Sequence, residues 1–208
     1  MHGSTGQALA GSQSISIKLV AGSETPDSSM RLPVGLLVLL LVAPCTPSLA
    51  AQPVSSVPAL DVSRYAGQWH EIARLPNRFQ KDCARDITAS YTLRRDGHLG
   101  VRNACIDKDG QAIVADGEAR PVKGHPGQLE VRFAPRWLAW LPLVWADYWV
   151  IDLDPDYTWA VVGEPGRDYF WILAREPSMD RALFEGLKLR ATQMGYELSG
   201  LVVTAPLR

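Results

Sequence analysis

Asp-Ile-Thr-Ala-Ser-Tyr-Thr-Leu-Arg, residues 86–94, alternates polar and apolar side chains with a period of two. That period is typical of a strand with one buried face, because successive side chains point to opposite sides of a sheet. Asp96-Gly97 follows, and this pair is typical of a tight turn between antiparallel strands. Residues 99–106 are again rich in apolar side chains. The stretch therefore predicts a β-hairpin.

Short apolar-rich runs separated by turn signals continue on both sides of this hairpin. Their regular spacing favours an antiparallel meander, arranged as a sandwich or as an up-and-down barrel. The fold class is therefore all-β. The eight predicted strands are 68–75, 86–94, 99–106, 112–120, 128–134, 147–153, 158–163 and 169–175.

The period changes after Pro177, where a single amphipathic helix is predicted. Ser178 is a suitable N-cap for a helix that begins at Met179, with Asp180 in its first turn, and Gly195 is a typical helix stop. We expect this helix to pack against the outside of the sheet, followed by a short strand over residues 201–204. Its apolar stripe consists of Leu183, Leu187, Ala191 and Met194.

The first fifty residues are predicted to lie outside the folded domain. Residues 1–29 are interpreted as a mis-assigned extension before Met30, or as a disordered leader. Residues 30–50 resemble a signal peptide, with an apolar run too short to span a bilayer. Cleavage after Ala50 would leave residues 51–208 as one domain. The alternative is a lipid anchor at Cys45, which the preceding Pro44 fits poorly; both versions take the protein out of the cytoplasm.

Composition and cysteine count narrow the function classes. The chain has 21 Lys and Arg against 22 Asp and Glu, so the balance of charge argues against nucleic-acid binding. Cys83 and Cys105 remain after the leader is removed, and an even number in an exported protein predicts a disulfide. Cys83 lies in the loop before the second strand and Cys105 ends the third, and these two strands are neighbours in a predicted hairpin, so the bridge is sterically plausible. A free nucleophilic thiol is the alternative.

Three short blocks of sequence stand at fixed places among the predicted strands. Gly67-Gln68-Trp69 opens the first strand, residues 154–157 (Asp-Pro-Asp-Tyr) lie between the sixth and seventh strands, and Arg175 ends the eighth. Together these blocks resemble the lipocalin family. The resemblance covers about residues 60–205 and is strongest to the bacterial outer-membrane lipocalins, relatives of apolipoprotein D, through residues 69–75 and 167–175. His70 departs from the family's usual Tyr. The resemblance implies a closed eight-stranded up-and-down barrel with one C-terminal α-helix packed outside.

The same blocks suggest which residues serve the fold. Gly67 permits a tight approach to the first strand, and Trp69 is large enough to plug one end of a barrel. Arg175 can lie across the indole and donate to nearby carbonyls. We expect a structural role for Gly67, Trp69, Asp156, Tyr157 and Arg175.

A lipocalin barrel implies binding of an apolar or amphipathic ligand, here a fatty acid or a lysophospholipid, for lipid storage or transport. Polar candidates for contacting a head group also include Arg74 and Arg102. No cofactor and no metal are expected, because the four His are scattered. The ligand-binding residues are predicted to be Glu71, Tyr91, Arg132, Phe133, Trp140, Tyr148 and Trp171.

The loop 135–145 is unusually apolar and is predicted to lie at the open end. It contains Trp137, Trp140 and Trp145. Three hypotheses follow: the loop folds over the barrel, it touches a membrane surface, or it forms a homodimer contact.

No hydrolase, phosphate-loop or metal-protease motif is present, so we predict a binding protein rather than an enzyme. The alternatives are an enzyme on the same barrel, such as a lipid isomerase or de-epoxidase, and a pigment or haem binder. A free inward cysteine or a pair of buried carboxylates would favour the enzyme. His70 is the one strand-borne histidine that could bind haem.

Overall fold

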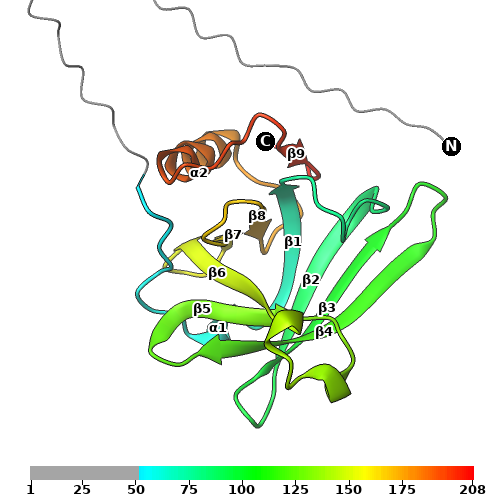
Figure 1. Cartoon of the computed structure of the whole chain (residues 1–208). Helices are drawn as coiled ribbons and strands as arrows, with labels where there is room; N and C mark the ends of the chain where they lie inside the picture. Colours follow the sequence, from blue (N-terminus) through cyan, green and yellow to red (C-terminus); the bar gives the residue numbers. More distant parts are fainter. Residues whose placement is uncertain (1–51) are drawn as a thin grey trace, which may run out of the picture. The chain divides into compact units, whose positions relative to one another are not determined.

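The computed structural model describes residues 52–208, and the predictions for the leader, the signal peptide, Cys45 and the cleavage site lie outside these residues. Eight antiparallel strands close into a barrel, because β1 pairs with both β2 and β8 (Figure 1). This confirms the predicted barrel. The strands are β1 (Gly67–Arg74), β2 (Arg85–Leu93), β3 (Leu99–Ile106), β4 (Ala112–Val122), β5 (His125–Arg132), β6 (Ala146–Leu153), β7 (Trp159–Gly163) and β8 (Phe170–Ala174).

One end of the barrel is closed by the short helix α1 (Val62–Tyr65), which precedes β1. Asp61 caps it, its Oδ1 accepting from the backbone N–H of Ser63 and Arg64. The β2–β3, β4–β5 and β6–β7 turns share this closed end, because the strands alternate in direction. The remaining loops, β1–β2, β3–β4, β5–β6 and β7–β8, surround the open end.

Helix α2 (Arg181–Gln193) packs outside the barrel, as predicted, but begins later than predicted. Asp180 is the N-cap, with its Oδ1 accepting from the N–H of Leu183 at 2.8 Å. Met179 cannot start the helix because its N–H donates to Pro206, in a bridge with the C-terminal segment. Within residues 52–208, no helix is long and apolar enough to cross a membrane.

The buried face of α2 is also displaced from the predicted stripe. Phe184, which the prediction omitted, is buried together with Leu187 and Ala191. Leu183 and Met194 are half-buried at its border. The predicted last strand is present as β9 (Val202–Val203), which pairs with the end of β1.

A β-bulge in β1 changes which side chains face the interior. The pairing with β8 shifts between Glu71 and Ala73, so one residue of β1 has no opposite partner. Ile72 and Ala73 consequently both join the core beneath α2, while Trp69 belongs to the interior core. Ala73 therefore does not share a face with Trp69 and Glu71, as strict alternation along the strand would require.

Arg175 holds the closed end together. Its guanidinium carbon lies 3.8 Å from the centroid of the fully buried Trp69 ring. Its N–H groups donate to five carbonyls, those of Arg64, Tyr65, Ala66, Gln68 and Tyr157. One side chain thus joins α1, β1, β8 and the β6–β7 turn.

The other predicted structural residues differ in what they contact. Gly67 has φ +98°, and a Cβ there would lie 3.1 Å from an Arg175 nitrogen, so both conformation and space require glycine. The Tyr157 hydroxyl accepts from the Asp61 N–H at 2.8 Å. Asp156 is exposed and makes no side-chain hydrogen bond within the described residues, so its expected role has no structural explanation.

Replacing Arg175 by Ala should lower the free energy of unfolding by about 3 kcal/mol, because several charge-assisted hydrogen bonds and the indole contact are lost together. Urea denaturation followed by Trp fluorescence measures this loss. Arg95→Ala, at an exposed arginine of the same end, is the matched control and should change stability by less than about 0.5 kcal/mol. Equal stabilities of the two variants would contradict the role assigned to Arg175.

Candidate ligand-binding site

The barrel encloses a cavity of about 360 Å³. Alternate residues of the strands face it, and most are aliphatic or aromatic, as is typical of pockets for small apolar ligands. Three loops contribute to its rim. The apolar wall is formed by Ile87, Ala89, Val101, Val131, Val162 and Leu173, and the rim by Arg78, Phe79, Gln80, Phe133, Ala134 and Tyr169.

The closed side of the cavity contains a chain of three tyrosines. The hydroxyl of Tyr148 lies 2.8 Å from that of Tyr65 and 2.7 Å from that of Tyr91. Burial raises the pKa of Tyr91 to about 12 and the pKa of both Tyr65 and Tyr148 well above the usual value of tyrosine. All three phenols therefore keep their protons at neutral pH.

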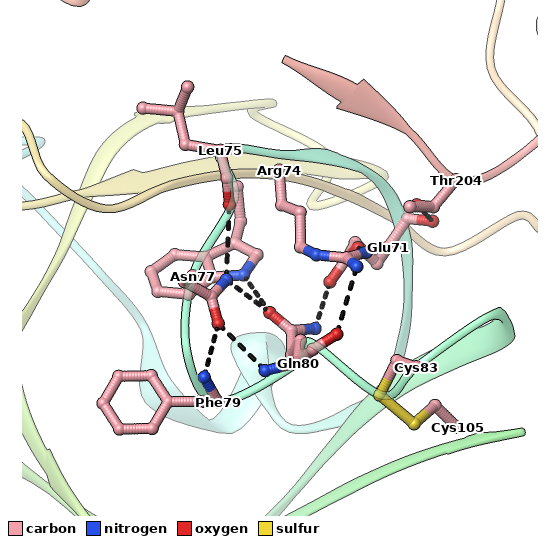
Figure 2. A network of polar contacts seen from close by, with 10 residues as sticks. Glu71, Arg74, Leu75, Asn77, Phe79, Gln80, Cys83, Cys105 and Thr204 are labelled. Atoms are coloured by element: carbon pink, nitrogen blue, oxygen red, sulfur yellow. Dashed lines mark hydrogen bonds and ion pairs between the residues drawn. A yellow bond between two sulfur atoms is a disulfide. The ribbon is translucent and has the colours of Figure 1, made fainter. Parts of the chain in front are cut away.

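A buried ion pair forms part of the wall (Figure 2). One carboxylate oxygen of Glu71 accepts from Arg74 at 2.6 Å, and the other accepts from the amide of Gln80 at 2.5 Å. The Gln80 oxygen in turn accepts from the indole N–H of Trp171 and the amide of Asn77. The carboxylate of Glu71 is therefore fully engaged, and it fixes the β1–β2 loop against the rim.

The same loop is held at a second point by a disulfide. Cys83 is bonded to Cys105 near the end of β3, with Cα atoms 5.6 Å apart. The predicted pairing is confirmed, and the alternative of a free thiol at these positions is wrong. The bridge spans a sequence separation of 22 residues. It reduces the conformational freedom of the unfolded chain, and in the folded chain it ties the β1–β2 loop to β3.

A second buried cluster lies on the outside of the barrel wall. Arg132 donates to Glu118 at 2.5 Å and to the Ala134 carbonyl at 2.6 Å, beneath the ring of Trp145. Burial acts to raise the pKa of Glu118, but the hydrogen bonds from His98 and Arg132 outweigh it and hold that pKa below its usual value. Asp96 lies close by, yet Arg132 and His98 already occupy both oxygens of Glu118, which argues against a metal site.

The comparisons with known proteins agree with this architecture. Residues 60–206 match the family model described as a lipocalin-like domain. The chain belongs to the lipocalin family.

Relatives of this lipocalin come from plants, bacteria and animals. Temperature-induced lipocalin-1 of Arabidopsis thaliana is 38% identical over 148 residues, covering 70% of this chain and 78% of that protein. Outer membrane lipoprotein Blc of Escherichia coli strain K12 is 32% identical over 163 residues, covering 78% and 88%. Apolipoprotein D of Macaca fascicularis is 33% identical over 151 residues, covering 69% and 76%.

A solved structure supports the fold alone. The cockroach allergen Per a 4 superposes with a TM-score of 0.57 at 18% identity, covering 76% of this lipocalin and 96% of that chain.

Six of the seven predicted ligand-binding residues line the cavity. Trp140 is 76% exposed and is not a lining residue. Arg132 lines the cavity, but it alternates with Val131 and Phe133, and its guanidinium is directed to Glu118 on the opposite face. The six are Glu71, Tyr91, Arg132, Phe133, Tyr148 and Trp171.

The two further polar candidates are also engaged elsewhere. Arg102 is exposed and pairs with Asp116 on the outer surface at 3.0 Å. Arg74 is buried behind Glu71, with which it pairs. Because neighbouring strand residues alternate between faces, Arg102 is excluded from the interior by the same register that brings Asn103 into it.

The apolar loop contains two short 3-10 turns, η1 (Arg136–Leu138) and η2 (Pro142–Val144). Trp145 packs back on the barrel wall, with its indole N–H donating to the Ala139 carbonyl and Arg120 lying 4.0 Å from its ring centroid. The tip is different: Trp137 is 73% and Leu143 96% exposed. The loop therefore covers the outer wall with one Trp and leaves its apolar tip free.

Most of the other lining residues were missed from the sequence, and three polar ones among them show why. Gln80 and Arg78 lie in a loop, where no periodicity indicates direction. Asn103 could have been found, because it stands between Val101 and Cys105 on the predicted inner face of its strand, and a polar residue at such a position is informative.

Arg74→Met should destabilise this lipocalin by about 3 kcal/mol or more, because Glu71 would remain buried without its cation. Arg85→Met is the matched control: it breaks an exposed pair with Asp86 and should cost less than about 1 kcal/mol. Urea unfolding at neutral pH measures both. If the two losses were equal, the buried pair would not have the stabilising role assigned to it.

Proposed function

We propose that this lipocalin binds one molecule of a single-chain amphipathic lipid, a fatty acid or a lysophospholipid, inside the barrel. The observation that carries the proposal is the cavity itself: a space of about 360 Å³ with a mostly apolar wall, inside a barrel that α1 closes at one end. Apolar surface transferred from water into such a space supplies the binding free energy.

The distribution of charge favours an acyl chain with its head group at the rim. Glu71, the buried carboxylate that lines the cavity, is already neutralised by Arg74. Arg78 lies at the rim, is exposed and forms no ion pair with any carboxylate in residues 52–208. A guanidinium in this position suits a carboxylate or phosphate head group.

The cell envelope is the proposed location, with storage or transport of lipid as the role. Supporting this are the expected signal peptide over residues 30–50 and the relationship to a protein named as an outer membrane lipoprotein. A lipid anchor at Cys45 would hold the protein at the outer membrane, whereas cleavage after Ala50 would release it to the periplasm.

The exposed loop tip supports a second part of the proposal, contact with a membrane surface. Trp137, Trp140 and Leu143 are all more than 70% exposed on one loop beside the open end. Trp side chains favour the membrane interface, and a lipid could then enter the cavity without crossing much water. A homodimer contact is the competing use of this surface.

The alternative functions receive less support from the residues described. The two cysteines within residues 52–208 are bonded to each other, and Glu71 is not accompanied by a second buried carboxylate in the cavity, so the features that would favour a lipid-modifying enzyme are not found there. His70 alternates with the inward Trp69 and Glu71 and does not line the cavity, which disfavours haem binding through it.

Titration of the purified protein with palmitate or lysophosphatidylcholine should displace a fluorescent fatty acid with a stoichiometry of one. Val131→Trp, which fills the cavity from its wall, should abolish displacement while leaving the fold intact by circular dichroism. Leu189→Trp, at an exposed position of α2, is the matched control and should bind normally. Lipid binding that survives Val131→Trp would contradict a site inside the barrel.

Trp137→Ser combined with Trp140→Ser should weaken binding to vesicles of phosphatidylethanolamine and phosphatidylglycerol at least about fivefold, because two interfacial anchors are lost. Co-sedimentation measures this, and Leu189→Ser is the control. Unchanged vesicle binding would refute the membrane contact. Loss of a concentration-dependent dimer in sedimentation velocity, without any effect on vesicle binding, would assign the loop tip to a homodimer instead.

A further inference from the structure

The three tyrosines at the closed side of the cavity have one proton more than they can use among themselves. Tyr65, Tyr148 and Tyr91 supply three O–H donors but form two hydrogen bonds with one another. Each bond consumes one donor. No further acceptor within residues 52–208 lies in hydrogen-bond range of these hydroxyls, so one O–H remains without a partner.

The spare O–H is best placed toward the cavity. Tyr65 is fully buried and does not line the cavity, so an unused proton there would lose its hydration without compensation. Tyr91 and Tyr148 both line the cavity, and a proton on either can reach a bound molecule. The arrangement in which Tyr65 donates to Tyr148 therefore leaves the free donor on the cavity side.

An unpartnered acceptor lies on the same inner surface. The side-chain oxygen of Asn103 is buried and has no hydrogen-bond partner within the described residues, although Asn103 lines the cavity. Tyr91 pairs with Val101 across β2 and β3, and Asn103 is two residues further along β3. Tyr91 and Asn103 are thus diagonal neighbours on the inner face of the sheet.

We propose that the tyrosine chain and Asn103 form a second polar subsite, deep in the cavity, that binds a hydroxyl group at the hydrocarbon end of the acyl chain. A hydroxyl accepts from the tyrosine O–H and donates to the Asn103 oxygen, so both unpartnered groups are satisfied at once. A plain methyl terminus satisfies neither. This inference rests on the proposed lipid-binding function and specifies its ligand class: an ω-hydroxylated fatty acid or a lysophospholipid that carries such a chain.

Selectivity between matched lipids tests the proposal. The affinities of saturated fatty acids from decanoate to palmitate are each compared with that of the corresponding ω-hydroxy acid, by displacement of a fluorescent fatty acid. At the chain length that reaches the tyrosines and Asn103, the ω-hydroxy acid should bind about tenfold tighter than its parent. The hydroxyl forms hydrogen bonds with buried polar groups that the parent acid leaves unpaired.

The variants identify the groups responsible. Tyr91→Phe combined with Tyr148→Phe removes both cavity-side hydroxyls and should abolish the preference, measured as the ratio of the affinities for the ω-hydroxy acid and its parent. Asn103→Leu, which leaves the tyrosines in place, should also reduce it. Tyr196→Phe is the matched control, because that hydroxyl donates to the Glu164 carbonyl outside the cavity.

Each result decides between the two proposals. A preference in the unaltered protein that disappears in the double variant supports the subsite. Equal binding of parent and ω-hydroxy acids at every chain length, or a preference that survives both the double variant and Asn103→Leu, overturns the subsite and leaves the lipid-binding proposal standing. If no fatty acid of either series binds, the proposed function itself fails.

Discussion

The contact of Arg175 with Trp69 is the interaction on which the barrel depends. A barrel of eight strands has to be plugged at one end if it is to hold a ligand at the other, and Trp69 fills that end without any exposed surface. The guanidinium covers the indole from below and binds carbonyls on both sides of the α1–β1 junction. Arg175 is more than 100 residues away from these carbonyls in sequence. A single side chain therefore fixes the point at which β1 and β8 close the barrel.

The interior above Trp69 contains two kinds of polar group: those whose hydrogen bonds stabilise the fold, and those with a hydrogen-bonding group left for a ligand. Glu71 is buried in the wall, yet Arg74 and Gln80 use both of its oxygens, so it stabilises the rim. Asn103 and the tyrosine chain differ from Glu71, because each has a hydrogen-bonding group without a partner on the cavity side. The number of unused donors and acceptors, rather than the presence of charge, therefore indicates where a ligand's polar atoms would be held.

Sequence periodicity was sufficient for the strands, because a strand with one buried face depends on local alternation. Trp69 and Arg175 at the closed end followed from short motifs, and the disulfide from the even number of cysteines that remain in the folded part of the chain. Periodicity failed where a single residue changed the register. The bulge after Glu71 turned Ala73 outward, and the C-terminal bridge at Met179 moved the start of the helix to Arg181, with Asp180 as the N-cap. Arg102 was mistaken for a cavity residue because its charge, not its parity on the strand, guided the choice.

The central claim is that the barrel holds one amphipathic lipid. Native mass spectrometry of the protein purified under mild conditions, followed by denaturation and analysis of the released lipid, tests it most directly. The account predicts a complex with one fatty acid or lysophospholipid per chain, or an empty barrel that takes up one added lysolipid. A protein that is empty after purification and that remains empty with excess fatty acid and lysolipid would contradict it.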